Sequence, residues 1–292
     1  MTHFIYTTMF DSGYGAKGMS LIESIQRRAR AGADEVKPQG YVLALDDKIA
    51  GVVRANADAL GVVYCRTLDE MLAEPYVGER LRKAKGDRTY QEFCWSLASL
   101  WTDHIMAGYM RDELLWYLDA DVFFFDTPMR LIEEMRGKSI GLQPHAHVAS
   151  EIKRLGKNGV YNIGTVAFRA DQVGRTALKW WSDEVLNWCK YSEGDRARWQ
   201  YCGDQGYADG IAEKWRKHVK EFGVGVSTAP WNVIMHTITD GPSTDGMPMI
   251  NYHFHEFKNR DQMTNYQICM ATERLVYAPY VESTERWQKV IG

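Results

Sequence analysis

The segment LLWYLDADVFFF, residues 114–125, is the strongest strand candidate in the chain, because apolar residues flank its pair of aspartates. An unpaired buried carboxylate is strongly unfavourable, so Asp119 and Asp121 need a compensating partner in such surroundings. Carboxylates at the carboxyl end of a buried strand suit a hard cation, and open α/β sheets bind ligands at that end. We therefore interpret both as ligands of Mn²⁺ or Mg²⁺. The alternative is a turn or helix-capping pair, since Asp-x-Asp is a weak motif.

The residues before this segment alternate between strand and helix patterns. The predicted strands are His3–Met9, Tyr41–Leu45 and Val62–Cys65, and the predicted helices are Gly18–Arg30, Ile49–Leu60 and Thr89–Met110. This order predicts parallel strands with helices on both faces of the sheet.

The residues after the segment continue the pattern less regularly. Thr127 and Pro128 are the residue types that begin a helix, a capping residue followed by Pro at the first helical position. The predicted strands are Ile140–Leu142, Val160–Phe168 and Met249–Phe254, and the predicted helices are Asp171–Trp188, capped by its first Asp, and Gly203–Trp215. The C-terminal tail has no clear pattern.

Composition and charge narrow the class of protein. Apolar residues make up 45% and charged residues 25% of the 292, which indicates a globular protein. The net charge of -3 provides no positive field for nucleic acid, which we exclude as a partner. The basic stretch of residues 80–88 is interpreted as a solvated helix face. The alternative is a docking patch for a phosphorylated or membrane-borne acceptor.

The cysteines and the apolar segments indicate the cellular compartment. Five cysteines without a CxxC pair fit a reducing environment, so we expect a cytoplasmic protein. The N-terminal apolar stretch is short and broken by Thr7 and Thr8, which predicts no signal peptide. The longest apolar run is interrupted by the aspartates and cannot supply the about 20 apolar residues of a membrane span. The protein is therefore expected to be soluble or, at most, peripheral.

Short segments along nearly the whole chain carry a resemblance to a known family. They are FIYTT (4–8) with Asp11 and Tyr14, YQEFCW (90–95), YLDAD (117–121), YNIG (161–164) with AFR (167–169), WW (180–181), WC (188–189), GDQ (203–205), APWN (229–232) and YHFHEFK (252–258). Their order and spacing resemble bacterial sugar transferases of the GT-A fold, which are distantly related to the glycogenin and galactosyltransferase-like retaining enzymes.

The resemblance implies a fold and an activity. The fold would be α/β of the GT-A type, a Rossmann-like nucleotide-diphospho-sugar transferase with a mixed central sheet flanked by helices. Residues 1–292 would form a single domain, with a nucleotide-binding half (1–125) and a donor-sugar and acceptor half (126–292). The activity would be metal-dependent transfer of a sugar from a nucleotide-diphosphate donor to a hydroxyl of a saccharide or glycolipid acceptor. Retention of configuration and a role in cell-surface polysaccharide or glycolipid synthesis are the family expectations.

The resemblance also implies roles for matching residues. The first strand-to-helix loop would hold the nucleoside through Thr7, Thr8, Asp11 and Tyr14. The metal ligands would be Asp119 and Asp121 with His253 or His255, which share one face of an alternating strand. Lys258 would contact the diphosphate, Asn162 and Gly164 would line the donor-sugar pocket, and Asp204 and Gln205 would face the reacting sugar carbon, with Asp204, Gln205 and Lys258 as the catalytic set.

Several of these residues have plainer interpretations. Lys258 could be a solvated lysine, Asn162 a turn cap and Asp204 the N-cap of a helix. Tyr90 and Trp95 are interpreted as core residues, since they lie at helical spacing with other apolar residues. One departure from the family pattern is Glu256, which stands where related transferases have Gly after the C-terminal His. It leaves open which His is the ligand.

Two rival functions are considered. A sugar-1-phosphate nucleotidyltransferase shares a related core but carries a Gly-x-Gly-x-Arg loop after the first strand, and residues 8–17 contain none. The other rival is a non-catalytic nucleotide-sugar-binding protein of the same fold.

Overall fold

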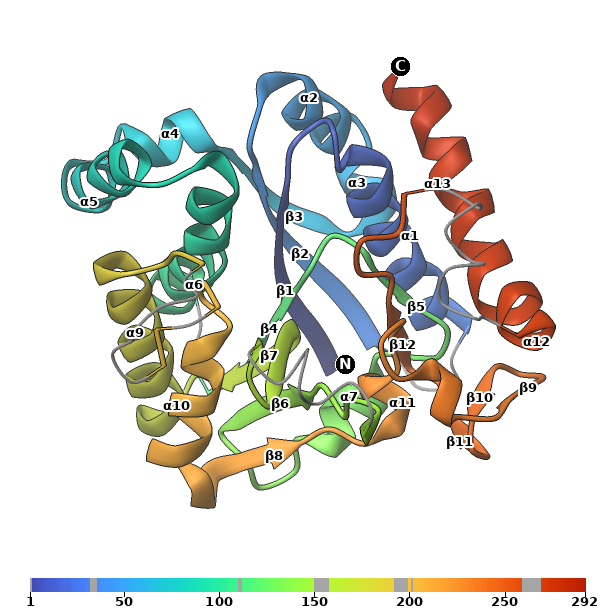
Figure 1. Cartoon of the computed structure of the whole chain (residues 1–292). Coiled ribbons are helices and arrows are strands. Elements are labelled where there is room, and N and C mark those ends of the chain that lie inside the picture. The colour runs from blue at the N-terminus through green and yellow to red at the C-terminus, as the bar shows by residue number, and fades with distance from the viewer. Residues whose placement is uncertain are drawn as a thin grey trace.

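The computed structural model describes residues 2–31, 36–109, 112–149, 158–191, 199–200, 202–258 and 269–292. Its centre is a seven-stranded sheet in the order β3-β2-β1-β4-β7-β6-β8 (Figure 1). The strands are β1 (Thr2–Phe10), β2 (Val36–Ala44), β3 (Val62–Thr67), β4 (Leu114–Leu118), β5 (Val122–Phe124), β6 (Ile140–Pro144), β7 (Tyr161–Arg169), β8 (Val219–Glu221), β9 (Ile238–Thr239), β10 (Ser243–Thr244), β11 (Met247–Pro248) and β12 (Asn251–His253).

Helices cover both faces of this sheet. The α-helices are α1 (Gly15–Ala31), α2 (Asp47–Ala55), α3 (Ala57–Leu60), α4 (Leu68–Leu72), α5 (Pro75–Asp87), α6 (Tyr90–Tyr109), α7 (Met129–Glu134), α9 (Gln172–Asn187), α10 (Gly206–Lys214), α11 (Val224–Ser227), α12 (Met270–Thr272) and α13 (Ala278–Ile291). Short 3-10 turns are η3 (Arg216–His218) and η4 (Val233–Met235), and the π-helical turn η6 (Glu273–Tyr277) leads into α13.

Strand alternation divides the core between the two faces. Phe4 and Trp116 point to the face that α1 covers, with α13 packed outside α1. Ile5 and Leu115, one residue further along each strand, point to the face that α6 and α9 cover. Figure 1 shows α1 and α13 on one side of the sheet and α6, α9 and α10 on the other. The sheet is therefore buried on both faces, which explains the continuous apolar runs of its strands.

The sheet is mixed, as expected. β1 runs parallel to β2 and β4, and β2 runs parallel to β3, so the N-terminal strand–helix alternation predicted the direction of these strands correctly. β7 lies antiparallel between β4 and β6. Parallel β1 and β4 therefore bring their carboxyl ends, and the loops that follow them, to the same edge of the sheet.

The prediction of one strand over residues 114–125 is wrong. β4 ends at Leu118, and β5 leaves the central sheet to pair antiparallel with β12. Between them the chain turns, with the Val122 amide donating to the Asp119 carbonyl at 3.0 Å. The turn is held to β7 because the Asp119 amide donates to the Gly164 carbonyl at 3.0 Å. Both carboxylates thus lie in a turn at the carboxyl end of β4.

Other boundaries differ locally. β2 begins at Val36 rather than Tyr41, the helix expected over residues 49–60 is divided at Asn56 into α2 and α3, and Pro128 is the N-cap of α7 rather than its first residue. The capping role of Asp171 is confirmed, since its side chain accepts from the Gly174 amide at 2.8 Å. The tail without a pattern forms α13, which buries Tyr280 and Trp287.

The basic stretch in α5 is partly engaged with the rest of the fold. The Arg80 guanidinium forms an ion pair with Asp183 at 3.1 Å, and Arg88 donates to the Leu186 carbonyl at 2.7 Å. These contacts join α5 to α9 and favour the interpretation as a helix face over that of a docking patch. No helix among the described residues is both long enough and apolar enough to span a membrane.

Candidate metal centre

Three side chains converge at the carboxyl end of β4. One ligand atom from each of Asp119, Asp121 and His253 lies within 4.8 Å of the others, the only such group found among the described residues. His253 Nε2 is 3.1 Å from Asp121 Oδ1 and 3.7 Å from Asp119 Oδ2. The pairing of β12 with β5 produces this arrangement, because it sets His253 opposite Val122, next to the turn that carries both aspartates.

Burial makes the charges of this cluster interdependent. The Asp121 and His253 side chains are 9% and 2% exposed, whereas Asp119 is 29% exposed. Burial alone would raise the pKa of Asp121, but the charge and hydrogen bond of His253 hold that pKa well below its usual range. Burial would lower the pKa of His253, but the Asp121 and Asp119 carboxylates raise it overall. Positive charge at His253 thus stabilises the carboxylates in the protein without a cation.

Asp119 differs from Asp121 in its surroundings. Burial and the Asp121 carboxylate raise the pKa of Asp119, although His253 and a hydrogen bond oppose the shift. That bond comes from the Tyr117 hydroxyl, which donates to Asp119 Oδ1 at 2.7 Å and orients the carboxylate. Sequence reasoning did not identify Tyr117 as part of the site, since its place in β4 indicated only a core residue.

The His253 imidazole is held by a chain of side-chain hydrogen bonds. Its Nδ1 lies 3.0 Å from Asn162 Oδ1, which also accepts from the Gly164 amide at 2.7 Å. Asn162 Nδ2 in turn donates to Gln205 Oε1 at 2.9 Å. Because an amide oxygen only accepts, Nδ1 donates to Asn162 Oδ1, so Nε2 is the ring nitrogen that faces the carboxylates and can bind a cation after losing its proton. Two carboxylates and one imidazole fit Mn²⁺ or Mg²⁺, with imidazole favouring Mn²⁺.

Gly164 provides the space that this imidazole occupies. A Cβ at this position would lie 2.3 Å from His253 Nδ1 and 2.8 Å from Asn162 Oδ1. Asn162 and Gly164, which the resemblance places in a donor-sugar pocket, therefore both contact the imidazole. Their contact with a sugar stays a prediction.

We expect Asn162→Ala to weaken Mn²⁺ binding by about 10- to 100-fold, because groups that hydrogen-bond a ligating imidazole have effects of this size. Calorimetric titration with Mn²⁺ checks the prediction. The control is Asn187→Ala, an exposed asparagine at the end of α9. Equal Mn²⁺ affinity in Asn162→Ala and in the unaltered protein would contradict the positioning role.

His255 is not in the ligand group, which corrects the prediction that both histidines share one face. β12 ends at His253, so strand alternation does not continue to residue 255. The His255 ring lies 5.5 Å from the rings of both Trp231 and His253, and its side chain is 49% exposed. Glu256 follows with a φ of 55°, the left-handed conformation that glycine adopts most easily. The backbone thus takes a glycine-like turn with a Glu in place, and of the two histidines only His253 belongs to the candidate ligand group.

The expected nucleoside loop begins later than predicted. Thr7 and Thr8 lie inside β1 and are completely buried, so they present no surface to a nucleoside, which corrects the prediction. The Thr7 hydroxyl bonds Thr102 Oγ1 at 2.9 Å inside the core. The turn itself follows Phe10, and its Asp11 Oδ1 accepts from the Tyr14 amide at 2.9 Å. Asp11 and Tyr14 thus remain candidates for nucleoside contact.

Tyr90 is a residue that sequence reasoning placed wrongly. It was interpreted as core, but it is 61% exposed, and its hydroxyl donates to Asp11 Oδ2 at 2.8 Å. The contact joins the start of α6 to the turn after β1. The YQEFCW segment of the resemblance was the available signal.

Asp204 and Gln205 lie on the β7 side of the centre. Asp204 is not a helix cap, because the N-cap position of α10 falls on Gln205. Its Oδ2 is buried with no hydrogen-bond partner among the described residues, and burial raises its pKa well above the usual range, with a further contribution from Asp119. Gln205 Nε2 donates to the Asn158 carbonyl at 2.8 Å, so Gln205 anchors the chain of bonds that holds His253. Lys258 is exposed beyond β12.

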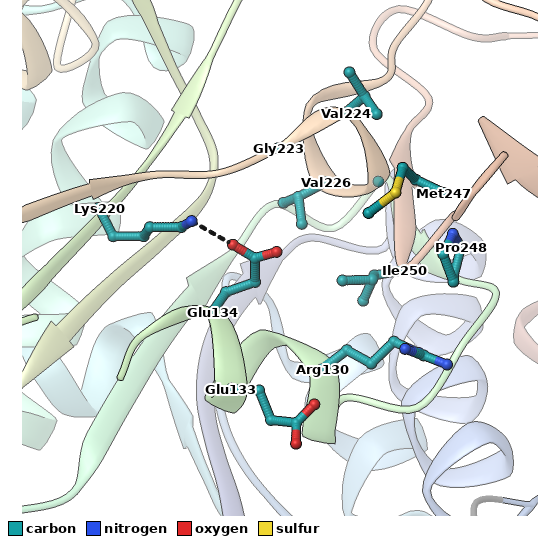
Figure 2. Close-up of a pocket in the computed structure, with 11 residues that line it drawn as sticks. Arg130, Glu133, Glu134, Lys220, Gly223, Val224, Val226, Met247, Pro248 and Ile250 are labelled. Atoms are coloured by element: carbon teal, nitrogen blue, oxygen red, sulfur yellow. Dashed lines mark ion pairs between the residues drawn. The ribbon is translucent and has the colours of Figure 1, made fainter. Parts of the chain in front are cut away.

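A separate cavity of about 380 Å³ lies at the other end of β12 (Figure 2). Its lining includes Val226 and Ile250, and its Lys220 and Glu134 form an ion pair at 2.7 Å. Ile250 precedes β12, whereas His253 ends it, so the strand separates the cavity from the acidic pair. The charged groups of this cavity are paired with one another or with neighbours, and we assign it no role.

Comparisons with known proteins place the chain among sugar transferases in fold. No protein-family model matches it. It is 29% identical over 221 residues to the uncharacterized protein YfnD of Bacillus subtilis (strain 168), covering 71% of this chain and 69% of YfnD. It is 26% identical over 264 residues to YfnF of the same organism, covering 87% of this chain and 81% of YfnF.

Solved structures with a similar fold are glycosyltransferases. The galactosyltransferase LgtC, in complex with donor and acceptor sugar analogs, matches with a TM-score of 0.55 at 15% identity, covering 97% of this chain and 96% of LgtC. Mouse xyloside xylosyltransferase 1 matches with a TM-score of 0.51 at 14% identity, covering 88% of this chain and 99% of that protein. These structures have the GT-A fold, which confirms the predicted fold class. At such identities the likeness concerns the fold alone.

Proposed function

We propose that this chain, which has the GT-A fold, is a metal-dependent glycosyltransferase that moves a sugar from a nucleotide-diphosphate donor to a hydroxyl acceptor. The observation that carries the proposal is the Asp119, Asp121 and His253 group at the carboxyl end of β4, with the imidazole held so that Nε2 faces both carboxylates. Ligands bind at this edge in open α/β sheets. The galactosyl- and xylosyltransferases of similar fold support the reaction class.

The proposed reaction breaks the bond between the sugar carbon and the diphosphate and forms one to the acceptor oxygen, with release of the nucleoside diphosphate and the acceptor proton. Asp119, Asp121 and His253 Nε2 would hold Mn²⁺ or Mg²⁺. When bound, this cation supplies stabilisation of the negative charge on the departing diphosphate. Asp204 would face the reacting carbon, where its buried Oδ2, which has no hydrogen-bond partner among the described residues, would accept or donate a hydrogen bond.

Further roles follow from position. Asp11 and Tyr14, at the turn after β1, would hold the nucleoside, and Lys258 would contact the diphosphate. Gln205 accepts a hydrogen bond from Asn162 and would therefore help to position the His253 imidazole. It would also lie near the donor sugar. We propose residues 1–125 as the nucleotide-binding half and residues 126–292 as the donor-sugar and acceptor half. A saccharide or glycolipid acceptor and a role in cell-surface polysaccharide synthesis complete the proposal.

The test screens a panel of nucleotide-sugars with Mn²⁺. The first measurement is the rise in melting temperature of the protein, and the second is release of nucleoside diphosphate with and without acceptors. A ligand that binds the native state raises its melting temperature. Stabilisation by one donor, followed by release that needs Mn²⁺, supports the proposal. Binding without release, across many acceptors, would indicate the non-catalytic alternative. Turnover of a sugar-1-phosphate with a nucleoside triphosphate would indicate a nucleotidyltransferase.

A further inference from the structure

Lys17 lies in the first turn of α1, at the sheet edge where the acidic pair is found. α1 begins at Gly15, directly after the turn that follows β1, and β1 pairs with β4 so that Thr7 lies beside Tyr117. The side chain of Lys17 is half-buried, and its ammonium lies 4.5 Å from the centre of the Tyr14 ring. This cation–π contact holds the charge above the residue that we propose for nucleoside contact.

The ammonium has no ion pair and no hydrogen bond with any residue that the structure describes, although acidic groups surround the site. It nevertheless acts on the metal centre electrostatically. Its charge contributes to the low pKa of Asp121 and opposes the raised pKa of His253. Burial lowers the pKa of Lys17 itself, while Asp121 raises it and Lys258 lowers it. The charge of Lys258, from a distant part of the chain, is therefore felt at Lys17.

We propose that the Lys17 ammonium is a second cationic contact for the donor diphosphate, approaching from α1 while Lys258 approaches from the segment after β12. The inference rests on the proposed function and extends it to a residue that neither the Asp-x-Asp segment nor the C-terminal segment contains. Two carboxylates are neutralised by one divalent cation, which leaves the charges of the diphosphate to be met by other groups. A pair of lysines supplies that charge.

The surroundings of Lys17 suit an anion. The first turn of α1 has no acidic residue, and α1 is 17 residues long, so the positive end of its dipole adds to the ammonium charge. The start of α1 packs closely on the end of β1, since a Cβ at Gly18 would lie 2.3 Å from the Phe10 ring. The ammonium is half-buried, so it would lose little bound water when it contacts a phosphate oxygen. The partly buried surroundings would also strengthen the resulting charged hydrogen bond.

The test is calorimetric binding of inorganic pyrophosphate with Mg²⁺, a probe that does not depend on the nucleotide base. Lys17→Gln should weaken pyrophosphate binding on the order of tenfold or more, the usual effect of losing a hydrogen bond between charged groups. Lys17→Arg should restore part of the affinity. The matched control is Lys83→Gln, an exposed lysine on α5. A second titration with Mn²⁺ alone should show equal or tighter binding in Lys17→Gln, because a repelling charge near Asp121 is removed.

Weaker pyrophosphate binding without weaker Mn²⁺ binding distinguishes an anion contact from a structural role. Pyrophosphate affinity in Lys17→Gln equal to that of the unaltered protein would overturn the inference and leave the proposed function standing. Equal weakening of pyrophosphate and Mn²⁺, with a lower melting temperature, would also overturn it, since it would indicate lost packing. Absence of pyrophosphate binding in the unaltered protein would overturn the proposed function itself.

Discussion

Asp121→Asn is expected to abolish tight Mn²⁺ binding and to lower sugar transfer by about a thousandfold, because a bound cation supplies several kcal/mol of charge stabilisation to such a reaction. Asn keeps the shape of the side chain and can still bond the His253 ring, which lies 3.1 Å from Asp121 Oδ1. The fold should therefore survive, and the loss should be one of charge. Calorimetry with Mn²⁺ and release of nucleoside diphosphate from the donor identified in the screen measure the two effects.

The control for this substitution is Asp69→Asn, an exposed aspartate on α4. It should leave both measurements unchanged. Native far-UV circular dichroism of Asp121→Asn separates loss of the site from loss of the fold. Donor turnover in Asp121→Asn at the rate of the unaltered protein, with the same Mn²⁺ requirement, would show that the cluster at β4 is not the metal centre.

The second large effect concerns pH. A proton and a cation exclude each other at His253 Nε2, and the Asp121 and Asp119 carboxylates raise the pKa of His253 above its ordinary value of 6.5. Below the raised pKa, Mn²⁺ affinity should fall about tenfold for each unit of pH. The fall should begin at a higher pH than an ordinary imidazole would produce. Calorimetric titrations between about pH 5 and pH 8.5 measure the slope and its onset.

The same groups determine a stability change in the protein without a cation. The folded-state pKa of His253 is raised, so its contribution to stability is full below the unfolded value of 6.5 and is lost as the pH rises through the folded value. The pKa of Asp121 is lowered, so its contribution is full above the unfolded value of 3.8 and is lost as the pH falls through the folded value. The pair therefore stabilises the cation-free protein most between these two unfolded values.

A His253→Gln variant should remove the pH slope of Mn²⁺ binding and weaken the binding itself. His218→Gln, an exposed histidine in η3, is the control and should keep both. A slope that persists unchanged in His253→Gln would mean that another group competes with the cation, and the assignment of the third ligand would be wrong.

Some features of the fold could be predicted from neighbouring residues alone. Strand and helix patterns at the N-terminus predicted β1, α1 and the parallel direction of the strands, because a strand buried on both faces must be continuously apolar. The helix at the C-terminus was missed. α13 buries one side against α1 and against the aromatic cluster that contains Phe123 and Phe254, and that side could not be recognised before its partners were known.

The candidate metal centre, too, could be predicted only in part from the sequence. Asp119 and Asp121 could be identified from sequence, because carboxylates in apolar surroundings need a compensating charge wherever the chain places them. The choice of His253 over His255 could not, since it depends on β12 ending at residue 253 and on its register with β5. The contacts of Asn162 and Gln205 could not be predicted either, because they depend on β7 and the start of α10 lying beside the imidazole.

Sequence by itself determined that an acidic pair accompanies a core strand of an α/β sheet. Tertiary structure alone decided which distant groups lie near that pair, with His253 as the third potential ligand and Lys17 as a nearby cation. It also decided that Thr7 and Thr8 are core rather than surface residues. The reason is physical. The need to neutralise a buried charge is local and can be read from residue type, whereas the identity of the neutralising group depends on strand register and helix placement, which bring together residues more than 100 positions apart.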